Sequence, residues 1–133
     1  MPHDGQNMTQ TPSLILADLR GLTAQALPVV DGVFDTAKST LRTMVTGGDR
    51  ISGDLIEANQ TAAHGVAWLA TYTQALHQMQ GWADRLTADG KFGEIEQLIH
   101  QIAFAEYLLQ IAGGIQMNQG EVVRLQDMGL GAD

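Results

Sequence analysis

Apolar residues recur every three or four positions along most of the chain, which is the spacing of amphipathic helices. The first stripe follows Ser13, a residue suited to an N-cap, and predicts a helix over residues 13–27. Pro28 disfavours helical backbone at the preceding residue but fits the first turn of a new helix. We therefore expect a break at Pro28 and a second helix that stops before the Gly47-Gly48 pair.

Two longer stripes occupy the middle and later part of the chain. One predicts a helix over residues 52–86, with Gly81 as its weak point. After a turn at residues 89–91, the other predicts the most apolar helix of the chain, ending at Gly113-Gly114. The stripe on this last helix is broad, so we expect the helix to pack on more than one side.

These stripes predict an all-α fold, an antiparallel up-down bundle of three to four helices over residues 13–114. Residues 1–12 are rich in polar and helix-breaking residues and are expected to form a disordered tail. Residues 115–133 are expected to be a C-terminal tail or linker, with a helical turn around residues 121–125. Two valine pairs look strand-like but are too short to change the prediction: Val29-Val30 and Val122-Val123.

Charge and composition exclude several classes of function. Seven Lys and Arg residues against fifteen Asp and Glu residues give a formal net charge of −8, which opposes binding to nucleic-acid phosphates or anionic lipids. No apolar run approaches the roughly 20 residues of a membrane span, and no signal peptide is recognisable, so we expect a cytoplasmic protein. The absence of cysteine excludes disulfides, thiolate metal sites and cysteine nucleophiles.

The titratable residues form no recognisable catalytic or metal-binding set. His64 and His77 stand thirteen positions apart, too far along one helix to bind one ion, and we expect no metal site and no catalytic residue. Glu106 lies near the apolar stripe of the last helix, and we expect it to form a structural ion pair with an arginine rather than to act in catalysis. The candidate partners are Arg20, Arg42 and Arg85.

Three aromatic residues, Trp68, Tyr72 and Trp82, could suggest an aromatic box for a ligand. A stripe of aromatic residues at helical spacing belongs more often to a core or an interface. We therefore interpret these three residues as core or interface residues.

One segment resembles a known enzyme family. Residues 105–115, followed by residues 123–127, resemble the end of the C-terminal helical domain of acyl-CoA dehydrogenases, in which a Gln-Ile-x-Gly-Gly pattern precedes an Arg-Leu stretch. Residues 55–130 as a whole are similar to the helical extension that precedes the dehydrogenase core in the methylsuccinyl-CoA dehydrogenase branch of that family, in the ethylmalonyl-CoA pathway.

The resemblance implies a flavin connection for three positions. In the family, the matching Gln and paired Gly contact FAD across a subunit interface, so the resemblance implies Gln110, Gly113 and Gly114 as cofactor-binding residues. Gln116 and Met117 depart from the family pattern, which has Gly and Tyr there. The family's catalytic glutamate and its middle β-domain have no counterpart in this chain.

The resemblance therefore implies a helical packing or oligomerisation domain. Its parent enzyme would use FAD to dehydrogenate a short branched acyl-CoA between the α and β carbons, and its partners would be the dehydrogenase core or identical subunits. We expect the chain alone to be inactive and to hold no FAD. The alternative is a free-standing helical protein-interaction module with no flavin link.

Overall fold

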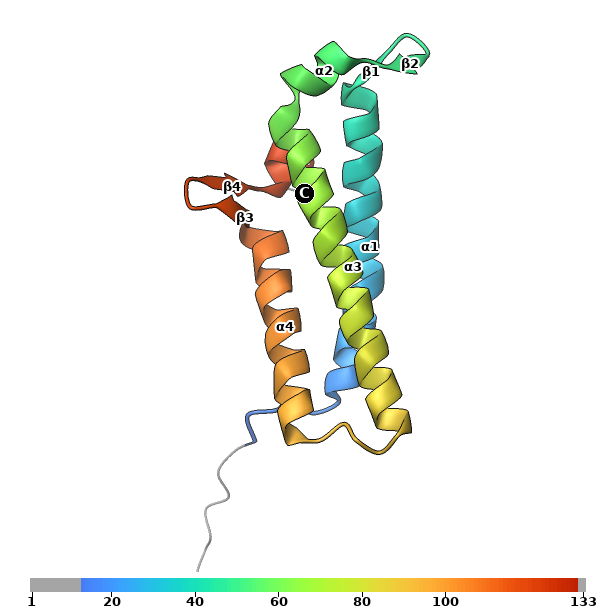
Figure 1. The fold of residues 1–133 in the computed structure, drawn as a ribbon, viewed down its shortest axis with the longest axis vertical. Coiled ribbons are helices and arrows are strands. Elements are labelled where there is room, and N and C mark those ends of the chain that lie inside the picture. The colour runs from blue at the N-terminus through green and yellow to red at the C-terminus, as the bar shows by residue number, and fades with distance from the viewer. Residues whose placement is uncertain (1–12, 132–133) are drawn as a thin grey trace, which may run out of the picture.

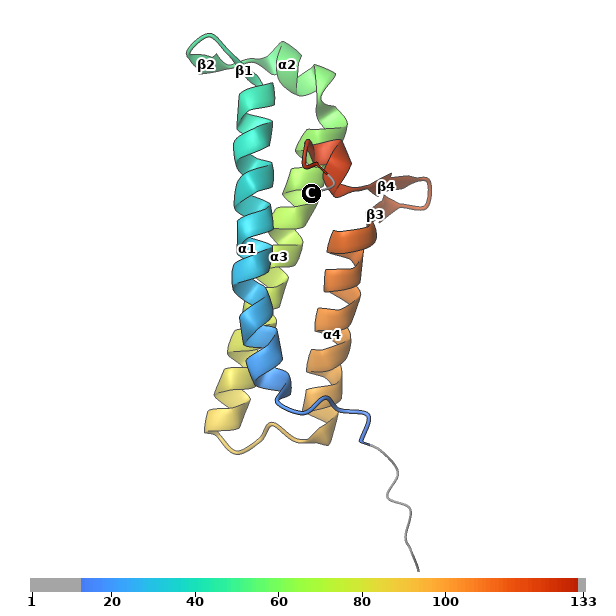
Figure 2. The ribbon, with the colours of Figure 1, turned by 180° about the vertical axis from the view of Figure 1, so that it is seen from behind.

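The computed structural model describes residues 13–131, so the predicted tail over residues 1–12 lies outside the described part. Three long helices dominate it: α1 (Leu19–Met44), α3 (Gln60–Ala88) and α4 (Glu94–Gly113). Consecutive long helices run in opposite directions, and α3 crosses α1 so that it lies between α1 and α4 only in the half of the bundle where α3 begins (Figure 1, Figure 2). The predicted all-α antiparallel bundle is confirmed.

Helix α1 runs through Pro28 without a break, so the expectation of two helices divided there was wrong. Pro28 has no N–H to donate to the Ala24 carbonyl, but its ring is exposed to solvent and meets no neighbour in the core. Thr23 and Val30, on either side of Pro28, are both buried. Packing of both halves on the same neighbours outweighs the loss of one hydrogen bond.

The predicted start of the first helix was also wrong, because α1 begins only at Leu19, after Asp18 in a left-handed conformation (φ 52°). Residues 14–16 bind α4 instead. The backbone N–H of Leu16 donates to Oε1 of Gln101 at 2.8 Å, and Nε2 of Gln101 donates to the Leu14 carbonyl at 3.0 Å. Gln101, at least 85 positions away in the sequence, therefore binds backbone groups that would otherwise form helical hydrogen bonds.

A small hairpin and a short helix connect α1 to α3. Strands β1 (Thr46–Gly47) and β2 (Arg50–Ile51) pair antiparallel and lead into α2 (Gly53–Ala58). The Ser52 side chain caps α2 by accepting a hydrogen bond from the N–H of Leu55.

The helix predicted over residues 52–86 is divided at Asn59, whose side-chain amide donates to the Leu55 carbonyl at 2.8 Å. An asparagine that bonds its own backbone in this way competes with helix continuation. Gly81, the expected weak point, lies inside α3 and does not interrupt it.

The chain after α4 folds back onto the bundle. Strands β3 (Ile115–Asn118) and β4 (Glu121–Val123) form an antiparallel hairpin, and a 3-10 helix, η1 (Leu125–Met128), follows. Three side chains of this segment are fully buried against the helices: Ile115, Val123 and Met128. Residues 115–131 are thus part of the folded unit, although the sequence suggested a tail or linker; whether another domain follows stays a prediction.

The helical turn expected around residues 121–125 was wrong, since Val122 and Val123 belong to strand β4. The turn between the strands explains the difference. Oδ1 of Asn118 accepts from the N–H of Gly120 at 2.9 Å, and Nδ2 of Asn118 donates to Glu121 at 2.8 Å. Such asparagine turns favour a hairpin between short β-branched segments.

Candidate functional site

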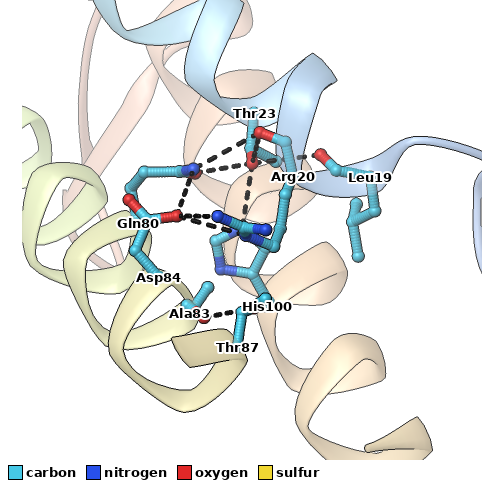
Figure 3. Close-up of polar contacts among 8 residues, drawn as sticks. All are labelled: Leu19, Arg20, Thr23, Gln80, Ala83, Asp84, Thr87 and His100. Carbon is cyan, nitrogen blue, oxygen red and sulfur yellow. Dashed lines mark hydrogen bonds and ion pairs between the residues drawn. The ribbon is translucent and has the colours of Figure 1, made fainter. Parts of the chain in front are cut away.

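A buried polar cluster joins the three long helices where α1 and α4 approach each other (Figure 3). Thr23 of α1 is central: its Oγ1 lies 2.6 Å from Oε1 of Gln80 on α3 and 2.9 Å from Nε2 of His100 on α4. All three side chains are buried, and His100 is fully inaccessible to solvent. One hydroxyl thus holds contacts to both neighbouring helices.

The hydrogen bonds of Gln80 assign the protonation of His100. Because Nε2 of Gln80 donates to the Arg20 carbonyl at 3.3 Å, its Oε1 is the acceptor for the Thr23 hydroxyl. The single hydroxyl proton is then used, so Nε2 of His100 must donate to Thr23. Nδ1 of His100 carries a lone pair and has no hydrogen-bond partner within the described chain.

An ion pair borders the cluster. Nη2 of Arg20 lies 2.8 Å from Oδ1 of Asp84, and both side chains are about half exposed, so solvent screens the pair. Burial lowers the pKa of His100 below its usual value; Asp84 and the Met79 backbone oppose this shift, and Arg20 adds to it. His100 is therefore a neutral, closed-in histidine, with no route for a substrate or ligand to reach it.

This cluster was not predicted from the sequence. Thr23, Gln80 and His100 are all buried, on α1, α3 and α4 respectively. The available signal was a polar residue at an inward helical position on each of three helices. Finding the cluster from that signal would have required the relative register of the helices.

The resemblance pointed to Gln110, Gly113 and Gly114, and the structure places all three at the end of α4. Oε1 of Gln110 accepts a 2.6 Å hydrogen bond from the hydroxyl of Tyr72, whose pKa is raised by burial and by neighbouring Tyr107. Gly113 is in open space, since a side chain there would meet nothing within 4 Å.

Gly114 has a structural explanation. Its φ of +137° favours glycine, and a Cβ atom there would lie 2.6 Å from Cγ1 of Val122 in the hairpin. The space beside Gly114 is thus filled by the chain itself. The role of Gln110, Gly113 and Gly114 toward FAD stays a prediction of the resemblance.

Glu106 is exposed on α4, and the expected ion pair was wrong: within the described residues no arginine or lysine lies at ion-pair distance from it. The carboxylate instead borders an open groove of about 560 Å³ between α3 and α4. Residues that line this groove, here called the α3–α4 groove, include Ala75, Met79, Arg85, Ala103, Glu106 and Tyr107.

The aromatic residues do not gather into one box. Tyr72 stacks on Tyr107 with ring centroids 4.5 Å apart and meets Trp68 edge-on at 6.2 Å. Trp82 instead packs edge-on against Phe92, next to the loop before α4. The Tyr72 group and the Trp82–Phe92 pair therefore pack at two different positions along α3.

Other site types can be stated for residues 13–131 only. No three His, Asp or Glu side chains converge there as metal ligands would. His77 instead pairs with Asp31, with Nε2 2.7 Å from Oδ1. None of the described helices is long and apolar enough to cross a bilayer.

The outer face of α4 carries an apolar stripe that nothing in the described chain covers. Ile95, Ile99, Ile102 and Leu109 are each between 50% and 70% exposed, although large aliphatic side chains are normally found inside. The sequence expectation that this helix packs on more than one side concerns this face.

The fold and its internal polar cluster define an all-α helical bundle, with one helix face left open in the described residues. No protein-family model matches this chain. Over 123 residues it is 50% identical to (2S)-methylsuccinyl-CoA dehydrogenase of Cereibacter sphaeroides. The alignment covers 92% of this chain and 22% of the relative, so the chain spans about a fifth of that enzyme's length. The similarity to the methylsuccinyl-CoA dehydrogenase branch is confirmed.

Proposed function

We propose that this chain is a helical packing domain of an acyl-CoA dehydrogenase like the relative from Cereibacter sphaeroides. The observation that supports this most is the 50% identity extending over 92% of the chain. An alignment of 123 of the 133 residues must include all three long helices rather than one short motif. The open apolar face of α4 agrees with a domain built to pack against another protein surface.

The parent reaction, in this proposal, is FAD-dependent α,β-dehydrogenation of a short branched acyl-CoA, carried out in the cytoplasm. Such a reaction needs a carboxylate beside the α-carbon and a flavin on the opposite side of the substrate. The most prominent acid of this chain, Glu106, is exposed on the body of a helix, and His100 is sealed inside the bundle. The domain therefore supports the assembly of the enzyme and supplies no reacting group.

A chimera tests the proposal. The matched segment of the Cereibacter sphaeroides enzyme is replaced by this chain, and acyl-CoA oxidation is followed with an electron-acceptor dye, together with flavin content. We expect activity within about tenfold of the parent and unchanged flavin content, because a domain at 50% identity preserves its packing positions.

Two controls give this test its meaning. Deleting the matched segment from the relative should reduce soluble, flavin-loaded enzyme, and an unrelated three-helix bundle inserted at the same place should not restore it. A chimera no better than the deletion would contradict the proposal and favour the alternative, a free-standing interaction module with no flavin link.

A further inference from the structure

The exposed stripe on α4 has the spacing of a helix–helix seam. Ile95, Ile99, Ile102 and Leu109 follow intervals of four, three and seven, and Glu106 occupies the remaining position of this four-three pattern. A heptad-like stripe of this kind fits against another helix rather than against a small molecule. The occupant of this face is therefore expected to present a matching apolar helix.

Two charges in or next to the stripe have no ion-pair partner among residues 13–131. Arg85 and Glu106 line the same α3–α4 groove, but no ion pair joins them. The Arg85 guanidinium folds back over Gly81, where a Cβ atom would lie 3.3 Å from its Nη1. A partner that supplies an acid near Arg85 and a base near Glu106 would satisfy both.

The register of α3 and α4 explains why these two residues miss each other. The hydrogen bond from Tyr72 to Gln110 sets these residues at the same level of two antiparallel helices. Gly81, nine residues after Tyr72, then lies level with Gln101, nine residues before Gln110. The Arg85 guanidinium over Gly81 is therefore about five residues from the level of Glu106. At 1.5 Å per residue, the guanidinium and the carboxylate are separated by roughly 7 Å along the helix axes.

We propose that the α4 stripe binds the α4 stripe of a second copy of this chain, antiparallel, about a two-fold axis at Ile102. Ile95 then meets Leu109 of the second copy, and Ile102 meets its own counterpart. Glu106 of the second copy comes level with Leu98, about three residues, or roughly 5 Å, from the level of the Arg85 guanidinium. This offset is shorter than the roughly 7 Å that separates Arg85 from Glu106 of its own copy, so each copy supplies the counterion that the other lacks.

The size of the face sets the expected affinity. Helix α4 has 20 residues, so it is about 30 Å long, and a single helix face is roughly 10 Å wide. An interface of this footprint belongs to the small, weak class, and we expect a dissociation constant on the order of 10 μM. The only charged residue within the stripe is Glu106, so like charges do not oppose each other along the seam.

The experiment is sedimentation of the 133-residue chain from about 1 to 500 μM, with helicity and thermal melting measured for every variant. The wild-type chain should pass from monomer to dimer, and Ile102→Glu should remain a monomer, because it places two carboxylates at the two-fold axis. Glu106→Arg and Arg85→Glu should each weaken the dimer about tenfold, and the double variant should restore it to within about threefold.

Glu57→Arg makes the same charge change on α2, away from the stripe, and should leave the dissociation constant unchanged. A wild-type chain that stays monomeric at 500 μM, an Ile102→Glu variant that still dimerises, or a double variant no tighter than the single ones would each overturn the inference. The inference builds on the proposed packing role, but the test uses this chain alone. Its failure therefore leaves the outcome of the chimera experiment unaffected.

Discussion

The hydroxyl of Thr23 lies 2.9 Å from Nε2 of His100, although the two residues are 77 positions apart. The same hydroxyl donates to Gln80, so a single side chain ties α1 to both other long helices. Helices α1 and α4 share few other contacts, whereas α1 packs along much of α3. The polar cluster therefore helps to fix how α1, α3 and α4 pack against one another.

Replacing Thr23 by Val should lower the free energy of unfolding by about 2–3 kcal/mol. The substitution keeps the shape but leaves buried polar atoms of Gln80 and His100 without a partner, and such atoms cost about 1–3 kcal/mol. Urea unfolding measures the change. Thr36→Val is the matched control: Thr36 is exposed on the same helix and bonds only the Gly32 carbonyl, so its effect should stay within about 0.5 kcal/mol.

The buried state of His100 predicts a pH dependence of stability. Because the native pKa is lowered below the usual 6.5, the unfolded chain binds the proton more readily than the folded chain. The stabilisation is complete above pH 6.5 and is lost as the pH falls from 6.5 toward the native pKa. The slope from this one group reaches at most about 1.4 kcal/mol per pH unit.

Variants separate His100 from the other histidines. Glutamine at position 100 keeps a nitrogen donor near Thr23 but does not titrate, so His100→Gln should flatten the fall in stability between about pH 6.5 and 5. His77→Gln, which alters the half-exposed pair with Asp31, should keep that fall. Urea unfolding at several pH values decides, and equal slopes for His100→Gln and the wild type would contradict the assignment.

The apolar periodicity predicted the bundle because a helix shows itself in the spacing of apolar residues every three or four positions, which can be read directly from the sequence. The end of α4 at Gly113 and a helix start at residue 52 were accessible in the same way, from local residue types. Pro28 was misinterpreted because the penalty of an internal proline is local, whereas the burial of Thr23 and Val30 that outweighs it is tertiary. A rule based on neighbouring residues alone cannot compare the cost of the proline with the gain from this burial.

The candidate site was predicted less well for a related reason. The Thr23 cluster joins three helices and depends on their relative register, which no single stripe contains. Glu106 was expected in an ion pair because it lies near an apolar stripe, but the stripe itself faces solvent. Periodicity identifies an apolar face; it does not say whether the chain covers that face itself.

Removing the internal proline of α1 should stabilise the protein. Pro28→Ala supplies the missing N–H to the Ala24 carbonyl and removes a helix penalty of about 3 kcal/mol, partly offset by the greater freedom of the unfolded chain. We expect the free energy of unfolding to rise by about 1–2 kcal/mol in urea. Val29→Ala, at the neighbouring exposed position, should change it by less than about 0.5 kcal/mol. A drop in stability for Pro28→Ala would show that α1 needs its proline.

Close packing of the C-terminal hairpin on α3 makes a last prediction. A methyl group on Gly65 would lie 2.5 Å from Cγ2 of Val123 and 3.1 Å from Cγ of Met128, and both of those side chains are fully buried. Alanine gains about 1 kcal/mol over glycine inside a helix, but overpacking a filled core costs about 1–3 kcal/mol or more. Gly65→Ala should therefore lower the free energy of unfolding by about 1–2 kcal/mol and speed amide hydrogen exchange in β3 and β4.

Gly32 provides the matched control for this prediction. It lies inside α1, and a methyl group there would meet nothing within 4 Å, so Gly32→Ala should show only the helix-propensity term. We expect that variant to gain about 0.5–1 kcal/mol, opposite in sign to Gly65→Ala. Equal gains in the two variants would mean that residues 115–131 do not pack on α3 in solution, because only that packing distinguishes the two glycines.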